Sequence, residues 1–339
     1  MAKLKIMNRI TTIIISVSLI GGLVLMLTGY MLGAKTSAYA DFTGLHIANC
    51  DIQTVSEYNL QPFQDIRIDG TAIDIEVIPS DFYGVDIVNH SSAKVDWQID
   101  DGKLLISQKS ISLSRWFIIE SAFFDTGVTT ESYVKVYLPK AAALNSLIIQ
   151  TASGDITLRD FTGKTAQIGT ASGDITLHNF TGETAQIGTA SGDITLVQNT
   201  ISNATLNATS GTITVSSCSL KNGQIHVVSG DVSAKELVSD GLSIDSTSGD
   251  IWLQGNFTGN THIRSISGDI KIATTHKAED YDKNLSAKSG EINIDGQKTK
   301  QYQDLPNNKA PYRLTITGMS SDINVSFSKK SPFDTISIQ

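Results

Sequence analysis

The residues best placed for chemistry are aspartates that recur at a fixed interval. Each follows a Ser-Gly pair, and successive Ser-Gly pairs stand nineteen residues apart. The aspartates in this position are Asp155, Asp174, Asp193, Asp231, Asp250 and Asp269. Because Ca²⁺ prefers oxygen ligands, a row of carboxylates could recruit this ion.

The same aspartates also suit a structural part, since an aspartate beside a turn accepts hydrogen bonds from the backbone of that turn. Thr212 interrupts the row between Asp193 and Asp231, which a continuous ladder of metal ions would not tolerate. The nine-residue glycine-aspartate repeat that binds calcium is absent from the sequence. We therefore expect turn chemistry at these positions, with no metal and no other cofactor.

The histidines do not form a catalytic pattern. His178, His226 and His262 occupy three different positions of the repeat, so they would not lie above one another. No recurring Ser/His/Asp spacing and no metal-ligand spacing is present in the sequence. A groove with clustered Asp and Arg would favour a polysaccharide-cleaving β-helix enzyme. Without that evidence, the sequence predicts no catalytic, cofactor-binding or metal-binding residues.

An aromatic segment, "SRWFIIESAFF" from Ser114 to Phe124, departs from the pattern of the rest of the chain. Its only charges are on Arg115 and Glu120. It could fold over the open end of the repeats as a cap. Alternatively, it could be an exposed contact patch for a membrane or a partner. The residues of this possible contact patch are Arg115, Trp116, Phe117, Phe123 and Phe124.

All of these residues except the aromatic segment are carried by a repeat. "TASGDITLRDFTGKTAQIG" is followed directly by "TASGDITLHNFTGETAQIG". Ser-Gly pairs begin at Ser153, Ser172, Ser191, Ser210, Ser229, Ser248 and Ser267. Ser289-Gly290-Glu291 follows after twenty-two residues, and "SSDINVSF" from Ser320 is a final, degenerate copy. A fixed period near twenty with short β-type segments indicates a solenoid.

Three positions of the repeat are apolar throughout, with period-two spacing inside each strand, so they face a common interior. The first column is Ile156, Ile175, Ile194, Ile213, Val232, Ile251 and Ile270. The second is Leu158, Leu177, Leu196, Val215, Ala234, Leu253 and Ile272. The third is Ile149, Ile168, Ile187, Leu206, Ile225, Ile244 and Ile263. The position after Leu158 varies freely along the chain, so we expect it to face water.

Each coil is therefore expected to hold two strands and two turns, stacked on its neighbours about 4.8 Å apart. The glycine of each Ser-Gly pair fits a turn position with positive φ. Strand patterns from Asp65 to Lys140 lack the fixed period and predict irregular first coils that cap the stack. The polar stretch between Gly296 and Tyr312 carries two prolines and predicts a loop.

The N-terminus predicts a membrane anchor. Ile10 to Leu32 contains no charge, and at 1.5 Å per residue it would reach roughly 34 Å, enough to span a bilayer. Lys3, Lys5 and Arg9 precede it, which places residues 1–9 in the cytoplasm and the C-terminal domain outside. A signal peptide cleaved near Ala38-Tyr39-Ala40 is the alternative, although its apolar region would be shorter, about 7–15 residues.

The charge outside this segment excludes one class of partner. Residues 1–40 hold four basic and no acidic residues, which leaves 22 basic against 34 acidic residues, or −12. Such a surface repels nucleic acid and anionic lipid. Cys50 and Cys218 are the only cysteines; one lies near the anchor and the other inside the repeats. We expect both to be free thiols.

The motifs "IDIEVIP", "KLLISQ", "VKVYLPK" and the serial "SGDI" coils, from roughly Phe63 to Phe327, resemble a bacterial family of adhesin-like proteins with β-strand repeats, domain of unknown function 4097. The resemblance implies an envelope protein, of the kind found in Gram-positive bacteria, and brings no catalytic residues with it. These motifs are structural, so they specify the fold better than the function.

The sequence thus predicts an all-β, right-handed β-solenoid with 19-residue coils, preceded by one transmembrane helix. The expected parts are a tail at 1–9, a helix at 10–32, a juxtamembrane linker at 33–62, the solenoid at 63–328 and a tail at 329–339. The expected role is adhesion or association with an envelope component, a glycan or another protein. The alternatives are an accessory protein that modulates a membrane stress sensor and, third, a polysaccharide-acting enzyme.

Overall fold

The structure is a computed structural model that describes residues 37–41, 44–47, 52–90, 93–108, 117–120, 131–303 and 310–328. The chain divides into two compact units. Within the described part of the smaller unit, three strands form an antiparallel sheet in the order β2-β1-β9. They are β1 Ser37–Asp41, β2 Gly44–Ile47 and β9 Phe117–Glu120.

Several predictions concern residues outside the described ranges. These residues are the expected anchor at 10–32, the terminal tails, Cys50, Arg115, Trp116, Phe123 and Phe124. Phe117 is described only as a backbone position of β9, where it pairs with Ala40. Among the helices that the described ranges contain, none has the length and apolar character needed to cross a membrane.

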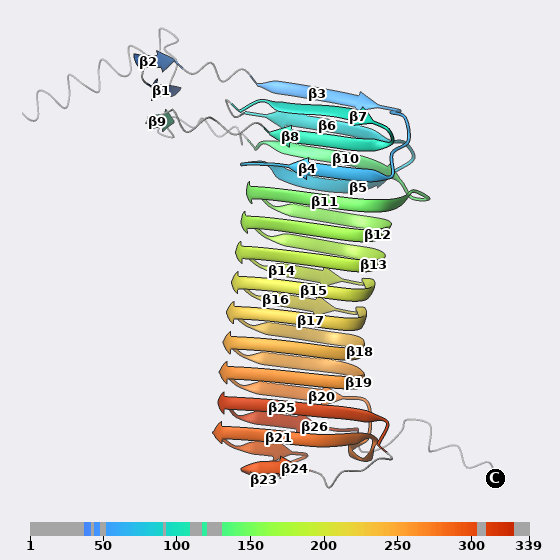
Figure 1. Ribbon diagram of the computed structural model, residues 1–339, viewed down its shortest axis with the longest axis vertical. Coiled ribbons are helices and arrows are strands. Elements are labelled where there is room, and N and C mark those ends of the chain that lie inside the picture. Colours follow the sequence, from blue (N-terminus) through green and yellow to red (C-terminus); the bar gives the residue numbers. More distant parts are fainter. Residues whose placement is uncertain are drawn as a thin grey trace, which may run out of the picture. The chain divides into compact units, whose positions relative to one another are not determined.

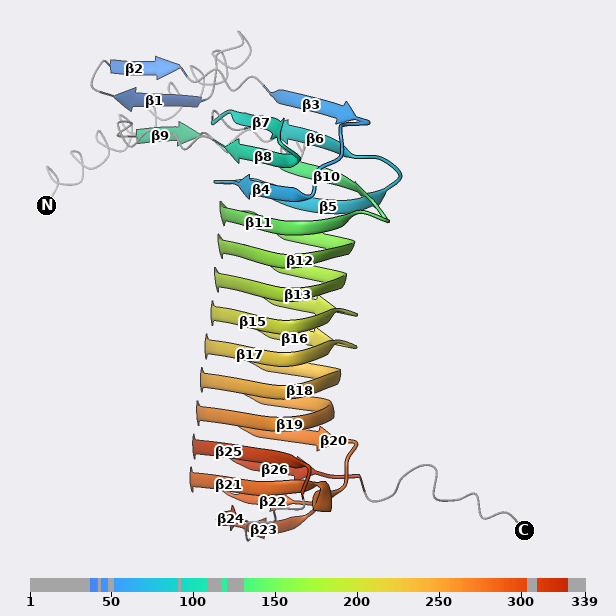
Figure 2. The ribbon, with the colours of Figure 1, turned by 45° about the vertical axis from the view of Figure 1, so that its right-hand side comes forward.

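The larger unit is a stack of coils (Figures 1 and 2). Neighbouring coils pair in parallel with an offset of nineteen residues, as Ile156 with Ile175 and Ile175 with Ile194. The strands of the regular coils are β11 Ala143–Ser153, β12 Ile156–Ser172, β13 Ile175–Ser191, β14 Ile194–Val197, β15 Thr200–Ser210, β16 Ile213–Ser216, β17 Ser219–Ser229, β18 Val232–Ser248, β19 Ile251–Ser267 and β20 Ile270–Thr274.

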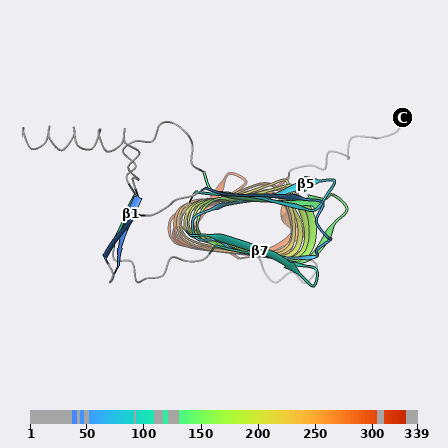
Figure 3. The ribbon, with the colours of Figure 1, turned by 90° about the horizontal axis from the view of Figure 1, so that it is seen from above.

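Seen along the stack, these coils superimpose into a flattened ring with two long sides (Figure 3). Each side is a parallel sheet made of one segment from every coil. The chain changes side at two corners. One corner is the Ser-Gly-Asp turn, and the other holds a non-glycine residue with positive φ. These residues are Asp160, Asn179, Gln198, Ser217 and Glu236, with φ between 52° and 57°.

The interior of the ring is the predicted core. Every side chain of the three apolar columns is at most 3% exposed, so their inward orientation is confirmed. A further inward column begins with Phe161 and Phe180, whose rings stack 4.6 Å apart. The variable position after Leu158 is half-buried or exposed in every regular coil, as expected for an outward column.

The turn glycines adopt the predicted backbone conformation. Gly249 has a φ of 125°, and a Cβ atom added to it would lie 2.1 Å from the carbonyl oxygen of Gly230 in the preceding coil. A side chain at this corner would therefore push two coils apart. Close stacking of the backbones, together with φ, explains the glycine.

The irregular strands from Gln53 to Pro139 extend both sheets of the stack. β4 pairs in parallel with β11, and β5 pairs in parallel with β12. β3 lies inside the range 33–62, for which a linker was expected, and pairs antiparallel with β6. The strands are β3 Gln53–Tyr58, β4 Asp65–Asp69, β5 Asp74–Ser80, β6 Gly84–Asn89, β7 Val95–Asp100, β8 Lys103–Gln108 and β10 Tyr133–Pro139.

The C-terminal coils do not follow sequence order. β25 pairs with β19 on one side and with β21 on the other, and β26 lies between β20 and β22 in the same way. The coil formed by β25 and β26, called here the inserted coil, is thus last in sequence but second from the end of the stack. The elements are a 3₁₀ helix Ala278–Asp280, β21 Tyr281–Ser289, β22 Ile292–Ile294, β23 Gln297–Thr299, β24 Gln301–Gln303, β25 Tyr312–Ser320 and β26 Ile323–Ser326.

The prediction of a loop between Gly296 and Tyr312 is wrong in part. It contains β23 and β24, which pair antiparallel with β22 and β21 and cover the outer edge of the last coil. Pairing with an otherwise open sheet edge supplies hydrogen bonds that a polar sequence pattern does not reveal.

Candidate functional site

The aspartates form a ladder of hydrogen bonds along one corner of the larger unit. The carboxylate Oδ1 of Asp155 accepts the backbone N–H of Asp174 at 2.8 Å, and Asp174 accepts that of Asp193 at 2.8 Å. Asp193 in turn accepts the N–H of Thr212 at 2.7 Å. The aspartates were expected to accept hydrogen bonds from their own turns; the donor is instead the backbone of the next coil. Stacking in register brings that N–H over each carboxylate.

The ladder continues beyond the regular repeats. Asp74 accepts the N–H of Asp155 at 2.8 Å, and Asp322 of the inserted coil accepts the N–H of Glu291 at 2.8 Å. One carboxylate oxygen of these aspartates is thus committed to holding two coils together. Within the part of the chain that the structure describes, no group of three or more His, Cys, Asp or Glu side chains is placed to hold a metal ion.

One buried polar side chain in the core was missed by the sequence reasoning. Asn199 follows Phe161 and Phe180 in the inward column and is 1% exposed. Its Oδ1 accepts the N–H of Phe180 at 2.8 Å, and its Nδ2 donates to the carbonyl of Leu177 at 3.0 Å. The nineteen-residue offset from Phe180 is the signal that could have found it.

Cys218 is the next residue in this column and carries a free, buried thiol, as expected for this cysteine. Burial raises the pKa of the thiol, although hydrogen bonds with Asn199 oppose this effect. The thiol accepts the N–H of Asn199 at 3.3 Å and donates to the carbonyl of Ser216 at 3.2 Å. This environment keeps the side chain protonated and unreactive, so Cys218 is a packing residue.

The histidines remain apart, but one of them belongs to an ionic group. His226, Asp245 and Arg264 follow one another in a single outward column across three coils. Asp245 lies 3.6 Å from His226 Nδ1 and 3.9 Å from Arg264 Nη1. These residues stand nineteen apart, so the same counting that aligned the aspartates could have found them. Because all three are substantially exposed, the group stabilises the fold only weakly.

The same outward column is uncharged in the earlier coils, where it forms the candidate binding surface. Here Gly169 and Gly188 leave a shallow hollow of about 470 Å³. We call its polar rim the amide face, which consists of Gln150, Gln167, Gln186 and Asn207. A Cβ atom on Gly169 would lie 2.7 Å from the Gln150 side-chain oxygen, so the glycine leaves room for this amide beside it.

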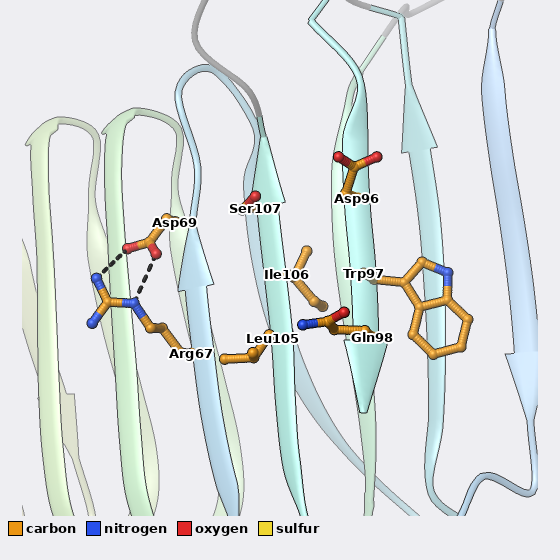
Figure 4. Close-up of a pocket in the computed structure, with 8 residues that line it drawn as sticks. All are labelled: Arg67, Asp69, Asp96, Trp97, Gln98, Leu105, Ile106 and Ser107. Atoms are coloured by element: carbon orange, nitrogen blue, oxygen red, sulfur yellow. Dashed lines mark hydrogen bonds and ion pairs between the residues drawn. The ribbon is translucent and has the colours of Figure 1, made fainter. Parts of the chain in front are cut away.

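A second hollow of about 470 Å³ continues this side of the larger unit across β4, β8 and β7 (Figure 4). Arg67 binds Asp69 through two hydrogen bonds, of 2.8 and 3.1 Å. Asp69 is the direct partner of Gln150 in the sheet, so the two hollows share one outer surface. Trp97 points away from the ion pair in Figure 4 and packs against the core.

This surface can form many hydrogen bonds without carrying a charge at its centre. Each side-chain amide offers two donors and one acceptor. The charged groups lie at its two ends, with Arg67 and Asp69 at one and the His226–Asp245–Arg264 group at the other. Such an arrangement suits a long, uncharged, polar ligand.

The solved structures to which this chain shows a likeness include three bacterial proteins, all distant in sequence. A "putative adhesin" from Parabacteroides distasonis is 16% identical, with a TM-score of 0.49, and covers 82% of this chain and 98% of its own. A "putative adhesin" from Parabacteroides merdae is 14% identical, with a TM-score of 0.49, and covers 83% and 98%. A "putative lipid binding protein" from P. distasonis is 16% identical, with a TM-score of 0.46, and covers 83% and 98%.

A search of curated proteins found no match. The family model described as Toastrack DUF4097 matches residues 63–255 and 189–326, which together make up more than half of the chain. The matched range begins in the irregular first coils and ends in the inserted coil. The chain therefore belongs to the toastrack DUF4097 family.

Proposed function

We propose that this protein is a membrane-anchored binding protein that associates with an uncharged polymer of the cell envelope. The anchor is the apolar run at 10–32, and the basic residues before it favour a cytoplasmic N-terminus with the right-handed solenoid outside the membrane. The parallel stack matched by the family model is the rigid body that presents the binding surface.

The amide face is the observation that carries this proposal. Its four amide side chains come from four successive strands, β11, β12, β13 and β15, and lie in two neighbouring outward columns. Gln167 and Gln186 are direct partners about 4.8 Å apart, whereas Gln150 and Asn207 lie at the two ends of the column that Gly169 and Gly188 occupy. Amides that span four successive coils in this way can bind an extended polymer that lies along the stack. Because sheets are rigid, the amides are already arranged before the ligand arrives, which lowers the entropic cost of binding.

A glycan is the polymer that these groups fit best. Hydroxyl and acetamido groups pair with amides, which both donate and accept hydrogen bonds. The net charge of −12 outside residues 1–40 disfavours nucleic acid and other polyanions. The protein is proposed to bind rather than cleave, and adhesion follows if the glycan belongs to another surface.

The test is binding of the purified protein, in detergent micelles, to a panel of neutral and anionic envelope glycans and matrix proteins. Gln186→Lys places a long charged side chain across the hollow and should abolish binding to any neutral glycan that the wild type retains. Thr176→Lys is the matched control, because Thr176 faces outward from the same strand on the opposite side of the coil.

Equal binding by the two variants would refute the amide face as the site. Binding of the wild type to matrix proteins alone would refute the proposed ligand class. Release of reducing ends from a bound glycan would refute a purely binding role.

A further inference from the structure

The inserted coil occupies a slot between two coils that precede it in the sequence. In β25, Ile316 pairs with Ile263 on one side and Leu285 on the other. In β26, Ile323 pairs with Ile270 and Ile292. The inserted coil therefore continues the apolar columns of the coils on both of its sides.

The inserted coil comes last in the sequence of the C-terminal region, although it lies inside the stack. The chain must first leave β20, pass the 3₁₀ helix Ala278–Asp280 and reach β21, two layers away. It then turns back through β23 and β24 before β25 can pair with both sides. A slot that the chain fills last can be filled by the same segment of another copy, because identical sequences offer identical pairing.

Backbone pairing, buried apolar side chains and the aspartate ladder hold the inserted coil. Asp269 accepts the N–H of Asp322 at 3.1 Å, and Asp322 accepts the N–H of Glu291 at 2.8 Å. Every one of these groups lies in the slot or in the coil that enters it. None of these hydrogen bonds depends on whether the two belong to one chain.

The core beside the slot contains buried hydroxyl groups, which need hydrogen-bond partners that a column of Ile and Leu would not need. Ser265 and Ser321 are buried with their hydroxyls 3.4 Å apart. The hydroxyl of Thr261, in β19 beside the slot, is buried and has no hydrogen-bond partner among the described residues. Gly318 of the inserted coil leaves space that Ser321 fills, since a Cβ atom on this glycine would lie 2.8 Å from the Cβ atom of Ser321.

The covalent link to the inserted coil is short. Only residues 304–311 connect the end of β24 to the start of β25, and they include Pro306 and Pro311. A short connection favours the exchange of an element between copies over its return to its own chain.

We propose that the inserted coil is an exchangeable element that joins two copies of this chain. In the exchanged dimer, residues 312–326 of each copy fill the slot between β19–β20 and β21–β22 of the other. The slot is the interaction surface, and the partner is a second copy of this chain. The dimer places two amide faces in one particle, which would increase the avidity of each for a shared polymer.

The experiment uses the full chain with Cys50→Ser, co-expressed in two differently tagged forms. One form carries Ser267→Cys and the other carries Ser320→Cys, at exposed positions that are direct partners across the slot. Coil exchange should give a disulfide that joins the two tags and runs on a non-reducing gel at twice the mass of one chain. Each form expressed alone supplies the background.

A matched control places Ser191→Cys and Ser210→Cys on separate chains. These residues are also direct partners, but their coils follow one another in sequence and leave no slot. No mixed disulfide should form there. A single chain that carries both Ser267→Cys and Ser320→Cys reports the unexchanged arrangement.

An internal disulfide in this double variant, with no mixed disulfide in the co-expressed pair, would overturn the proposal. If neither the internal nor the mixed disulfide forms, the proposal is overturned as well, because the inserted coil would then not occupy the slot. A mixed disulfide in the Ser191 and Ser210 control would also overturn it, by showing association without exchange.

Discussion

Replacing Ile194 tests the core of the stack most directly. Ile194 is fully buried and lies between Ile175 and Ile213 of the neighbouring coils. An Ile→Ala change in a core costs about 2–5 kcal/mol, and the cost is largest where the surroundings cannot collapse into the cavity. Backbone pairing fixes the coils on both sides at a spacing of about 4.8 Å. We therefore expect Ile194→Ala to cost about 4 kcal/mol.

The assay is thermal unfolding followed by far-UV circular dichroism. With roughly 2–4 °C per kcal/mol for a domain of this order of size, Tm should fall by about 8–16 °C. Ile194→Asp should be worse, because it buries an unpaired charge and would unfold several coils. Thr195→Ala, on the outward face of the same strand, should stay within about 0.5 kcal/mol of wild type. If Ile194→Ala melts no lower than Thr195→Ala, the inward assignment is refuted.

Three further changes test the polar groups. Asp193→Ala removes the acceptor of the Thr212 N–H and should lower the free energy of unfolding, measured by chemical denaturation, by about 0.5–1.5 kcal/mol. Asp193→Asn keeps an oxygen and should have a smaller effect. A Ca²⁺-induced rise in Tm that either variant abolishes would contradict a purely structural ladder. Asn199→Leu leaves the buried N–H of Phe180 without its acceptor and should cost about 1–3 kcal/mol; an unchanged denaturation midpoint would show that this amide is dispensable. Burial raises the pKa of Tyr281 to about 12. The stability that the protonated side chain contributes is therefore complete below the ordinary pKa of 10.0 and is lost as the pH rises through about 12. Tyr281→Phe should remove that loss from the pH dependence of unfolding, and an alkaline profile identical to that of the wild type would contradict the assignment.

The regular coils could be predicted from the sequence because the period fixes everything that matters locally. A nineteen-residue offset aligns Ile156 with Ile175, and alternation within the strand separates the inward Leu158 from the outward Arg159. The glycine at the corner follows from the same alignment. Nothing about these features depends on distant parts of the chain.

The order of the C-terminal coils could not be predicted in this way. The pattern identifies Ile323 as a member of the same column as Ile270 and Ile292, and the structure confirms that alignment. It does not say which of the two earlier coils should be adjacent, since every coil presents equivalent columns. The same ambiguity hid the donors of the aspartate ladder, because an acceptor beside a turn can be satisfied from its own coil or from the next.

The candidate surface was missed for a different reason. Gln167 and Gly169 carry no charge, no metal-ligating group and no nucleophile, so a search for catalytic chemistry passes over them. Their significance comes only from the partners that β11, β13 and β15 place beside them. A column of amides and glycines can be recognised once the register is known, but its hollow is a property of the assembled sheet.

The near identity of the two adjoining coils has a consequence for how this protein can change in length. Residues 151–169 and 170–188 differ at only three positions, and the strands β12 and β13 pair with each other residue for residue. An in-frame loss or gain of nineteen codons would rejoin the columns, the corner glycine and the aspartate ladder without a mismatch. Each such event would shift one end of the stack by about 4.8 Å while leaving both ends chemically intact. The coil is therefore both the unit of structure and the unit by which the stack can be lengthened or shortened.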